Sequence, residues 1–366
     1  MIDRDDITAW IRLLETPGVG RSCARRLLAA FGAPAAVLGA SHTARRQVVD
    51  AAVAEALGTR SKDVEARVLA CLAWLEESAP ETRALITLGD PRYPPSLLQT
   101  ADPPLLLYAQ GRSELMQAES LAVVGSRNPT PQGRENAHAF AAHFSRAGLT
   151  IVSGLALGID GAAHAGALEG PASTIAVVAT GLDEVYPRRH RELADRIARH
   201  GLLISEYAPG TPPLAENFPI RNRIIAGLTR GTLVVEAALQ SGSLITARLA
   251  VEAGREVFAV PGSIHSPQSR GCHALIKQGA KLVDRAEDVL EELQASSARN
   301  PSKNDAAGAK SDPVLEALGY EPVTLDALVA RTGWPAADLN VRLLDLELEG
   351  RVARLPGQLF QRLARG

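Results

Sequence analysis

The chain has 366 residues, of which 46% are hydrophobic and 22% charged, as in ordinary globular proteins with two or three domains. Its formal net charge is only −2, so any surface for nucleic acid would have to be a local basic patch. The three cysteines, Cys23, Cys71 and Cys272, form no CxxC pair. This spacing argues against a disulfide framework or a zinc site and favours a reducing cytoplasm.

The amino terminus is acidic and has no cationic segment ahead of an apolar one, so no secretory signal is expected. No run of residues approaches the ~18 apolar positions that a membrane-spanning helix needs. We therefore expect a cytoplasmic protein that makes no membrane contact.

Residues 1–75 are predicted to form a small helical domain. Apolar residues recur at helical spacing over Ile7–Leu14 and again over Ala24–Phe31. The Pro-Gly-Val-Gly sequence at 17–20 breaks the pattern between them. A break of this kind followed by a basic helix looks like a SAM or helix-hairpin-helix element, and whether it contacts DNA stays open. The basic residues are Arg21, Arg25 and Arg26.

From residue 84 to 293 the pattern is that of an α/β domain. A short strand is expected over Ala84–Leu88, and the proline-rich stretch from Asp90 to Pro104 is expected to be irregular or extended. Wholly apolar runs then alternate with helical patterns, which predicts a Rossmann-like, mostly parallel sheet covered on both faces. The further strands are expected at Leu121–Val124, Leu149–Val152, Thr174–Ala179, Leu202–Ile204, Thr232–Val235 and Glu256–Val260. Helices are expected at Gly133–Ala147, Arg191–His200, Ile224–Leu228 and Leu244–Ala253.

Residues 294–312 are rich in Ser, Ala, Asn and Lys and are predicted to be a flexible linker. Residues 313–366 read as three helices and a hairpin, which predicts a C-terminal winged-helix domain. Its candidate recognition helix carries one arginine, Arg342, against several acidic residues, so we expect phosphates to repel it and its contacts to be with protein. The acidic residues are Asp338, Asp345, Glu347 and Glu349. The elements are expected at Pro313–Leu318, Leu325–Ala330, Ala336–Leu348, Arg351–Leu355 and Gln358–Leu363.

Glycine-rich loops follow two of the expected strands. Gly125-Ser126-Arg127 follows the strand expected at Leu121–Val124, and the loop that begins with Ser153-Gly154 follows the strand expected at Leu149–Val152. Ligands of such sheets bind beyond the carboxyl ends of the strands, where glycine admits a close approach and a helix N-terminus offers free N–H groups to an anion. Arg127 adds a bidentate phosphate donor, although a plain turn with a surface arginine is an equal alternative for this loop alone.

Asp160 and His164 follow the second loop and would share one helix face. A metal or acid–base role is weighed here against a capping and packing role, which is favoured.

A third cluster combines an aromatic residue with cations. Phe218 is followed by Arg221, Asn222 and Arg223 at the expected start of a helix. Bases stack on aromatic rings while arginines neutralise phosphates, so this combination favours single-stranded nucleic acid over a core Phe beside solvated arginines. Ser241-Gly242-Ser243 precedes another helix and suits either capping or phosphate contact. Two further cations, which could also be ordinary surface charges, are Arg188 and Lys277.

Several catalytic motifs are missing from the sequence. It contains no GxxxxGK[ST] loop, no GxSxG elbow, no GxGxxG fingerprint and no metal-ligand spacing. The sequence therefore predicts a binding site without catalytic residues, cofactor or metal.

Five strings resemble the DprA family of bacterial DNA-processing proteins, also called Smf. They run from about residue 120 to 285 and read VVGSRNPTPQG, IVSGLALGIDGAAH, FPIRNRIIAGL, SGSLITARLAVEAGREVFAVPGS and GCHALIKQGAKLV. The resemblance implies a homodimer, formed through the Rossmann-like domain, that binds and protects incoming single-stranded DNA and loads RecA onto it. This activity serves natural transformation and homologous recombination and is not enzymatic, and single-strand-binding protein is a further candidate partner.

The resemblance also implies which residues line the DNA site. They are Gly125, Ser126, Arg127, Ser153, Gly154, Arg188, Phe218, Arg221, Asn222, Arg223, Ser241, Gly242, Ser243 and Lys277. At Cys272-His273 the sequence departs from the pair found in many relatives, which leaves any contact there in doubt.

The alternative is an enzyme related to the Rossmann-like nucleotide phosphoribohydrolases, which also hold a nucleotide phosphate on glycine loops. Glu236 is the residue we nominate as its acid or base. The PGGxGTxxE signature of that group is absent from the sequence, and release of base from nucleoside monophosphates would decide the question.

Overall fold

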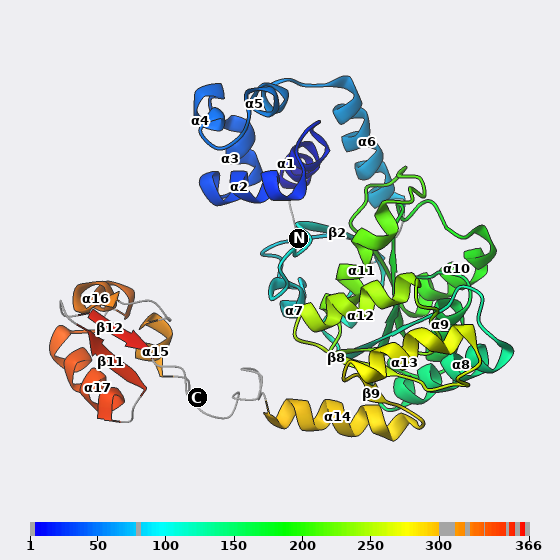
Figure 1. Cartoon of the computed structure of the whole chain (residues 1–366). Coiled ribbons are helices and arrows are strands. Elements are labelled where there is room, and N and C mark those ends of the chain that lie inside the picture. The colour runs from blue at the N-terminus through cyan, green and yellow to red at the C-terminus, as the bar shows by residue number, and fades with distance from the viewer. Residues whose placement is uncertain are drawn as a thin grey trace. The chain divides into compact units, whose positions relative to one another are not determined.

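A computed structural model of the chain describes residues 4–77, 82–299, 312–318, 323–332, 334–348, 351–355 and 359–362. The chain divides into two compact units, Met1–Leu293 and Gln294–Gly366 (Figure 1). No helix in the described ranges is long and apolar enough to cross a membrane.

Short helices form the beginning of the first unit, as the apolar stripes predicted. Leu13 of the first helix and Leu27 of the second are fully buried in a shared core. Gly32 ends the second helix with φ 87°, a conformation that glycine adopts without strain. The domain boundary expected at residue 75 stays a prediction. The helices are α1 (Arg4–Glu15), α2 (Arg21–Phe31), α3 (Pro34–Gly39), α4 (His42–Arg46), α5 (Ala51–Gly58) and α6 (Lys62–Glu76).

The rest of this unit is built on a nine-stranded sheet with the order β1-β2-β6-β5-β4-β3-β7-β8-β9. The strands from β6 to β9 in this order are parallel, and β2 pairs antiparallel with both β1 and β6. The strands are β1 (Arg83–Thr87), β2 (Leu106–Gly111), β3 (Ser120–Val124), β4 (Thr150–Ser153), β5 (Thr174–Val178), β6 (Leu202–Ser205), β7 (Gly231–Val234), β8 (Glu256–Ala259) and β9 (Lys281–Leu282).

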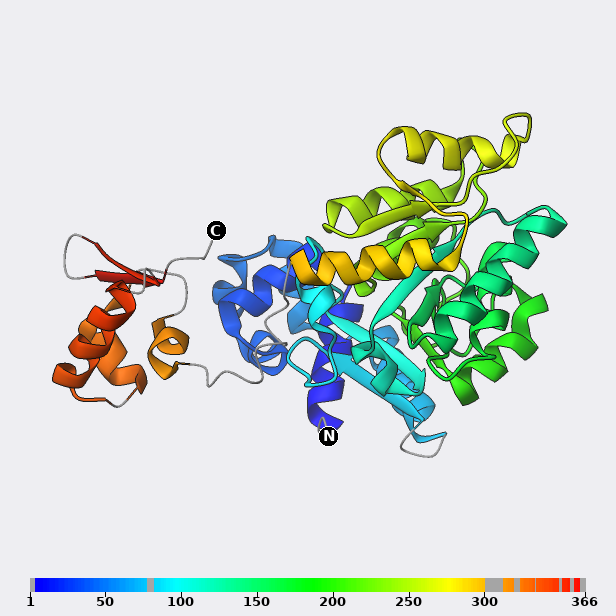
Figure 2. The same ribbon diagram turned by 90° about the horizontal axis from the view of Figure 1, so that it is seen from below.

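Helices cover both faces of this sheet (Figures 1 and 2). One core packs the sheet against α11, α12 and α13, and a second packs its other face against α8, α9 and α14. The side chains of β3 divide between them, with Ala122 and Val124 in the first core and Leu121 and Val123 in the second. Burial of both faces explains why the strands are apolar throughout. The α-helices here are α7 (Pro95–Leu98), α8 (Pro131–Arg146), α9 (Ile159–Ala167), α10 (Arg191–His200), α11 (Asn217–Leu228), α12 (Gly242–Glu252), α13 (Arg270–Lys277) and α14 (Ala286–Arg299).

The predicted mostly parallel Rossmann-like sheet is confirmed, with corrections at four elements. Strand β2 and the two-residue β9 were not expected. Helix α7 lies inside the stretch expected to be irregular, where Pro95 occupies a first-turn position that needs no N–H donor. Helix α11 begins seven residues earlier than expected, because Pro219 falls in its first turn, where the missing N–H breaks no helical hydrogen bond.

The second unit has the predicted winged-helix elements. Strand β12 pairs with both β10 and β11. Leu339, Leu343 and Leu346 of α17 are buried in its core. The elements are α15 (Pro313–Leu318), β10 (Val323–Thr324), α16 (Leu325–Thr332), α17 (Ala336–Leu348), β11 (Val352–Leu355) and β12 (Leu359–Arg362).

The first residues of the predicted linker are helical. Helix α14 continues to Arg299, so residues 294–299 are helical. Residues 300–311 lie outside the described part of the chain.

Candidate nucleic-acid interface

A cleft of about 750 Å³ lies at the carboxyl ends of the parallel strands. Strand order runs outward from β3 to β6 on one side and from β7 to β9 on the other. The adjacent strands β3 and β7 are therefore the switch point at which such sheets bind ligands. The loops after both strands line the cleft, together with α11.

The loop after β3 forms one wall of this cleft. A Cβ atom at Gly125 would come within 2.7 Å of Ile159 and 2.9 Å of the Glu236 carbonyl oxygen, so only glycine fits there. Ser126 Oγ accepts a hydrogen bond from the Asn128 N–H at 3.1 Å, which fixes the turn. Arg127 is exposed and extends from this turn into the cleft.

Aromatic rings stand beside Arg127. Its guanidinium carbon lies 5.8 Å from the centre of the Phe218 ring, within cation–π range. The Tyr186 ring lies 5.5 Å from that of Phe218, tilted by 59°. Phe218 is partly buried, whereas Tyr186 is 48% exposed. A cation and two aromatic rings thus face the same opening.

Arg221 lies beneath this opening with only 4% of its surface exposed. Its Nη1 donates to the Val177 carbonyl oxygen. Burial lowers the pKa of Arg221 to about 10, and the neighbouring Asp160 acts in the opposite direction. A Cβ atom at Gly154 would lie 2.3 Å from Nη1 of Arg221, so this glycine makes room for the arginine. Gly154 therefore affects the cleft indirectly, by leaving space for the Arg221 side chain.

Asp160 and His164 have structural partners. Asp160 Oδ2 accepts from the N–H groups of Gly154 at 3.1 Å and Ala156 at 3.3 Å, and burial raises its pKa. His164 is completely buried. No group of three or more candidate metal-ligating side chains occurs within the described residues. These contacts support the capping and packing interpretation.

The N-terminus of α12 forms the wall that follows β7. Ser241 Oγ caps the helix by accepting from the Ser243 N–H at 3.3 Å. Gly242 is exposed. Ser241, Gly242 and Ser243 all line the cleft, as does Asn222 of α11. Free N–H groups at a helix N-terminus are suited to a phosphate.

Comparison with known proteins identifies the family. Residues 84–294 match the family model described as DNA recombination-mediator protein A, and residues 297–358 match the DprA winged helix domain. The chain belongs to the DprA/Smf family. Protein Smf of Escherichia coli is 44% identical over 297 residues, which are 78% of each chain.

Solved DprA structures have the same fold. DNA processing protein A from Streptococcus pneumoniae is 39% identical, with a TM-score of 0.63 over 78% of this chain and 97% of that one. A structure describing the single-stranded DNA binding mode of DNA processing protein A from Helicobacter pylori is 31% identical. Its TM-score is 0.52, over 56% of this chain and 93% of that one.

Nine of the fourteen residues implied by the DprA resemblance line one cleft. They are Gly125, Ser126, Arg127, Phe218, Arg221, Asn222, Ser241, Gly242 and Ser243. Five others do not line it, namely Ser153, Gly154, Arg188, Arg223 and Lys277.

The five residues outside the lining differ in their surroundings. Ser153 is fully buried and its Oγ donates to the Val123 carbonyl oxygen at 2.7 Å, while Gly154 accommodates Arg221. Arg188 and Lys277 are exposed. Arg223 is held by two carboxylates and its side chain is 12% exposed. We therefore leave Ser153 and Arg223 out of the interface proposed below, because Ser153 Oγ donates to Val123 and Arg223 is already paired with Asp102 and Glu206.

Tyr186 is an aromatic cleft residue that sequence reasoning missed in this DprA chain. It lies two positions before Arg188, which was predicted as a contact only because of its charge. An exposed aromatic residue beside cations was the available signal. Its contact with Phe218 joins positions more than thirty residues apart, which no local pattern reveals.

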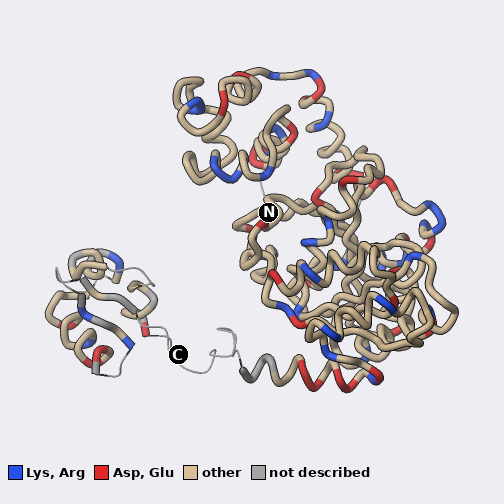
Figure 3. Tube along the Cα trace, in the orientation of Figure 1, with Lys and Arg blue, Asp and Glu red and all other residues tan. Residues whose placement is uncertain are grey.

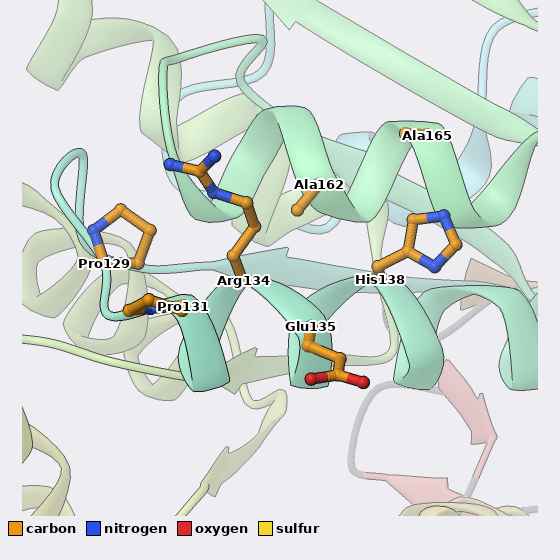
Figure 4. Close-up of a pocket in the computed structure, with 7 residues that line it drawn as sticks. All are labelled: Pro129, Pro131, Arg134, Glu135, His138, Ala162 and Ala165. Atoms are coloured by element: carbon orange, nitrogen blue, oxygen red, sulfur yellow. The ribbon is translucent and has the colours of Figure 1, made fainter.

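A second hollow of about 510 Å³ lies between α8 and α9 (Figure 4). Arg134 and His138 of α8 flank it, with Ala162 and Ala165 of α9 opposite. None of the residues implied by the DprA resemblance lines this hollow.

Proposed function

We propose that the chain binds single-stranded DNA in the cleft between β3 and β7. The observation that carries this proposal is the meeting of Arg127, Phe218 and Tyr186 at the switch point of the sheet. Cations beside stacking surfaces bind a single strand without reading its sequence. The single-stranded DNA binding described for the H. pylori relative supports single-stranded DNA as the ligand.

Each part of the cleft has a role in this proposal. Phosphates lie against Gly125–Arg127 and the N-terminus of α12, where backbone N–H groups and a guanidinium can donate to them. Bases stack on Phe218 and Tyr186. Arg221 supplies positive charge from beneath, since its own hydrogen bond is to the protein.

The family membership extends the proposal to partners. The chain protects incoming DNA in the cytoplasm and loads RecA onto it, in natural transformation and homologous recombination. It acts as a homodimer formed through the Rossmann-like domain, and single-strand-binding protein is a candidate further contact. The family description as a recombination mediator supports this role.

The contacts of Glu236 weigh against the alternative hydrolase. Its carboxylate accepts from both the N–H of Thr130, at 2.9 Å, and the hydroxyl of Thr130, at 2.6 Å. A carboxylate held by two donors at a helix N-terminus is a poor candidate for a proton-transferring group. We propose a binding protein without catalytic activity.

Single-stranded DNA binding at rising salt tests the proposal. We expect sequence-independent binding whose affinity falls with salt, and Arg127→Ala should reduce the slope of log affinity against log salt by about 0.7. Phe218→Ala should weaken binding by roughly 1–3 kcal/mol, through loss of one stacked base, without changing that slope. Assembly of RecA filaments on coated DNA measures the loading step.

Arg134→Ala is the control, because Arg134 is a cation in the second hollow, outside the cleft. Equal affinity and slope for Arg127→Ala and the unaltered chain would exclude the proposed cleft.

A further inference from the structure

Five charged side chains form a junction cluster where the N-terminal helices meet the sheet domain. Asp102 is its centre and receives three arginines. The cluster consists of Arg21, Arg25, Asp102, Glu206 and Arg223.

The distances in the cluster are those of direct ion pairs. Arg21 Nε donates to Asp102 Oδ2 at 2.9 Å, and Arg25 Nη2 donates to Asp102 Oδ1 and to the Pro103 carbonyl oxygen. Arg223 Nε donates to Asp102 Oδ2 at 2.8 Å, and its Nη2 donates to both oxygens of Glu206 at 2.6 and 2.9 Å. Arg223 and Glu206 are each only 12% exposed. Helix α2 is therefore tied through Asp102 to α11.

Helix α11 also carries the proposed DNA contacts. Phe218, Arg221 and Asn222 line the cleft, while Arg223 of the same helix belongs to the junction cluster. One rigid helix thus connects the helical region with the cleft.

Residues 206–217, here called the wall loop and including the first residue of α11, separate the cleft from a second space. That space is a cavity of about 380 Å³ between the N-terminal helices and the sheet domain. Pro212 and Leu214 line the cavity, whereas the alternate residues Pro213 and Ala215 line the cleft. The wall loop begins at Glu206, a member of the junction cluster. A shift at the junction would therefore move a wall of the cleft.

We propose that the junction cluster positions α11 and the wall loop for DNA binding, and that Asp102 and Arg25 act on DNA affinity without touching DNA. This inference rests on the proposed function and gives Arg223 a different role from the DNA contact that its motif implied. Binding and positioning are linked reciprocally, so DNA should also steady the junction.

Removing the charge of Asp102 tests the inference, because a positioning role and a purely electrostatic role predict opposite changes in DNA affinity. Neutralising an acidic residue near a DNA site raises the local positive charge, which on electrostatic grounds alone strengthens DNA binding. In the cluster, Asp102→Asn leaves three arginines facing Glu206 alone, so their repulsion should loosen the junction and weaken binding. The two views predict opposite changes in affinity.

The first measurement compares affinities for single-stranded poly(dT) oligonucleotides in the full chain. Asp102→Asn and Arg25→Gln are expected to weaken binding by about fivefold, the lower end of usual coupling between sites. Asp102→Glu, which keeps the charge, should restore most of the affinity. Arg26→Gln is the matched control, since Arg26 lies next to Arg25 on α2, is exposed and stands outside the cluster.

Unchanged or tighter binding by Asp102→Asn would overturn the inference. So would equal losses in Arg25→Gln and Arg26→Gln, which would instead indicate direct DNA contact by α2. Arg223 and Glu206 are left unaltered, because removing one partner of a buried pair can unfold the chain.

The second measurement is amide hydrogen exchange without DNA. The Gly210 N–H donates to Asp183 and the Asn217 N–H donates to the Leu214 carbonyl oxygen, so the wall loop has protected amides to follow. Asp102→Asn should raise the amide exchange rates of the wall loop and leave those of Arg127 and Asn128 unchanged. Equal exchange rates of the wall loop in the variant and the unaltered chain would overturn this inference but not the proposed function. Failure of the unaltered chain to bind DNA would overturn the proposed function. The exchange rates would still show whether the junction cluster positions the wall loop.

Discussion

At the scale of single residues, different partners separate two arginines that the sequence presents alike. Arg221 donates to Val177 and lines the cleft, whereas Arg223, two positions along the same helix, faces Asp102 and Glu206. Replacing either one removes a buried hydrogen-bonded cation and leaves its partners unsatisfied. Exposed Arg127 is therefore the better residue with which to test DNA contact.

His164 shows how burial fixes a protonation state. Its Nε2 accepts from the Leu155 N–H at 3.3 Å, so Nδ1 carries the proton and donates to Thr174 Oγ1 at 2.7 Å. Thr174 Oγ1 in turn donates to the Ile151 carbonyl oxygen at 2.6 Å. Burial, followed by the charges of His190 and Arg221, lowers the pKa of His164 to about 3.

The lowered pKa of His164 predicts acid destabilisation. In the unfolded chain the imidazole takes up a proton near pH 6.5, but in the folded chain only near pH 3. The stability that His164 contributes is thus complete above about pH 6.5 and is lost as the pH falls toward 3. The free energy of unfolding should fall by up to about 1.4 kcal/mol per pH unit from this group.

Denaturant titrations between pH 7 and pH 4.5 measure that slope. His164→Gln should flatten it, while His138→Gln, at a side chain that is 41% exposed, should not. Parallel pH profiles for the unaltered chain and His164→Gln would contradict the prediction.

At the scale of elements, Glu236 joins the loop after β7 to the start of α8. Its carboxylate binds Thr130, the N-cap of that helix, and Thr130 Oγ1 also accepts from the Gly133 N–H at 3.0 Å. A Cβ atom at Gly133 would lie 2.3 Å from the carboxyl carbon of Glu236, so this glycine leaves room for the cap. The negative charge also complements the N-terminal end of the helix dipole.

Glu236→Gln should therefore lower stability rather than remove an activity. We expect a loss of about 1 kcal/mol in the free energy of unfolding, with single-stranded DNA affinity unchanged. Glu135→Gln, which removes a charge from α8 without touching the cap, is the control. Release of base from nucleoside monophosphates by the unaltered chain, abolished in Glu236→Gln, would instead favour the hydrolase.

At the scale of the whole molecule, charges of both signs are mixed along the chain, with acidic residues grouped on α14 (Figure 3). In the second unit the Arg342 of α17 is paired with Asp312 at 2.5 Å and with Asp345 at 3.7 Å. The exposed face of this helix includes Val341 and Leu344, which are 63% and 56% exposed. These features favour contact with protein over contact with phosphate.

The winged helix should accordingly contribute little to DNA affinity. A chain ending at Arg299 keeps α14 intact, with Val289 and Leu293 in the core of the first unit. We expect this shortened chain to bind single-stranded DNA with an affinity within twofold of that of the full chain. The 313–366 fragment should not bind duplex DNA by itself, and adding it to the shortened chain should not increase duplex binding. Gel shifts at moderate salt measure both, and duplex binding by the fragment would contradict the prediction.

Local patterns of the sequence were sufficient for the class of fold and for most of its elements. The apolar runs marked β3 to β8 because both faces of a parallel sheet are buried, and the glycine loops after β3 and β4 marked the edge that binds ligands. Strand β2, which lies between β1 and β6, and the true start of α11 were not predicted. Strand β2 follows a proline-rich stretch, and α11 contains a proline in its first turn.

Tertiary structure alone decided which of the motif residues share a site. Strand order placed the loops after β3 and β7 side by side, although more than a hundred residues separate them. It also brought Tyr186 to Phe218, turned Arg223 away toward Asp102 and Glu206, and used Glu236 to cap a helix. A sequence determines which residues are apolar, charged or free to turn, but the neighbours of a side chain follow from contacts between distant segments.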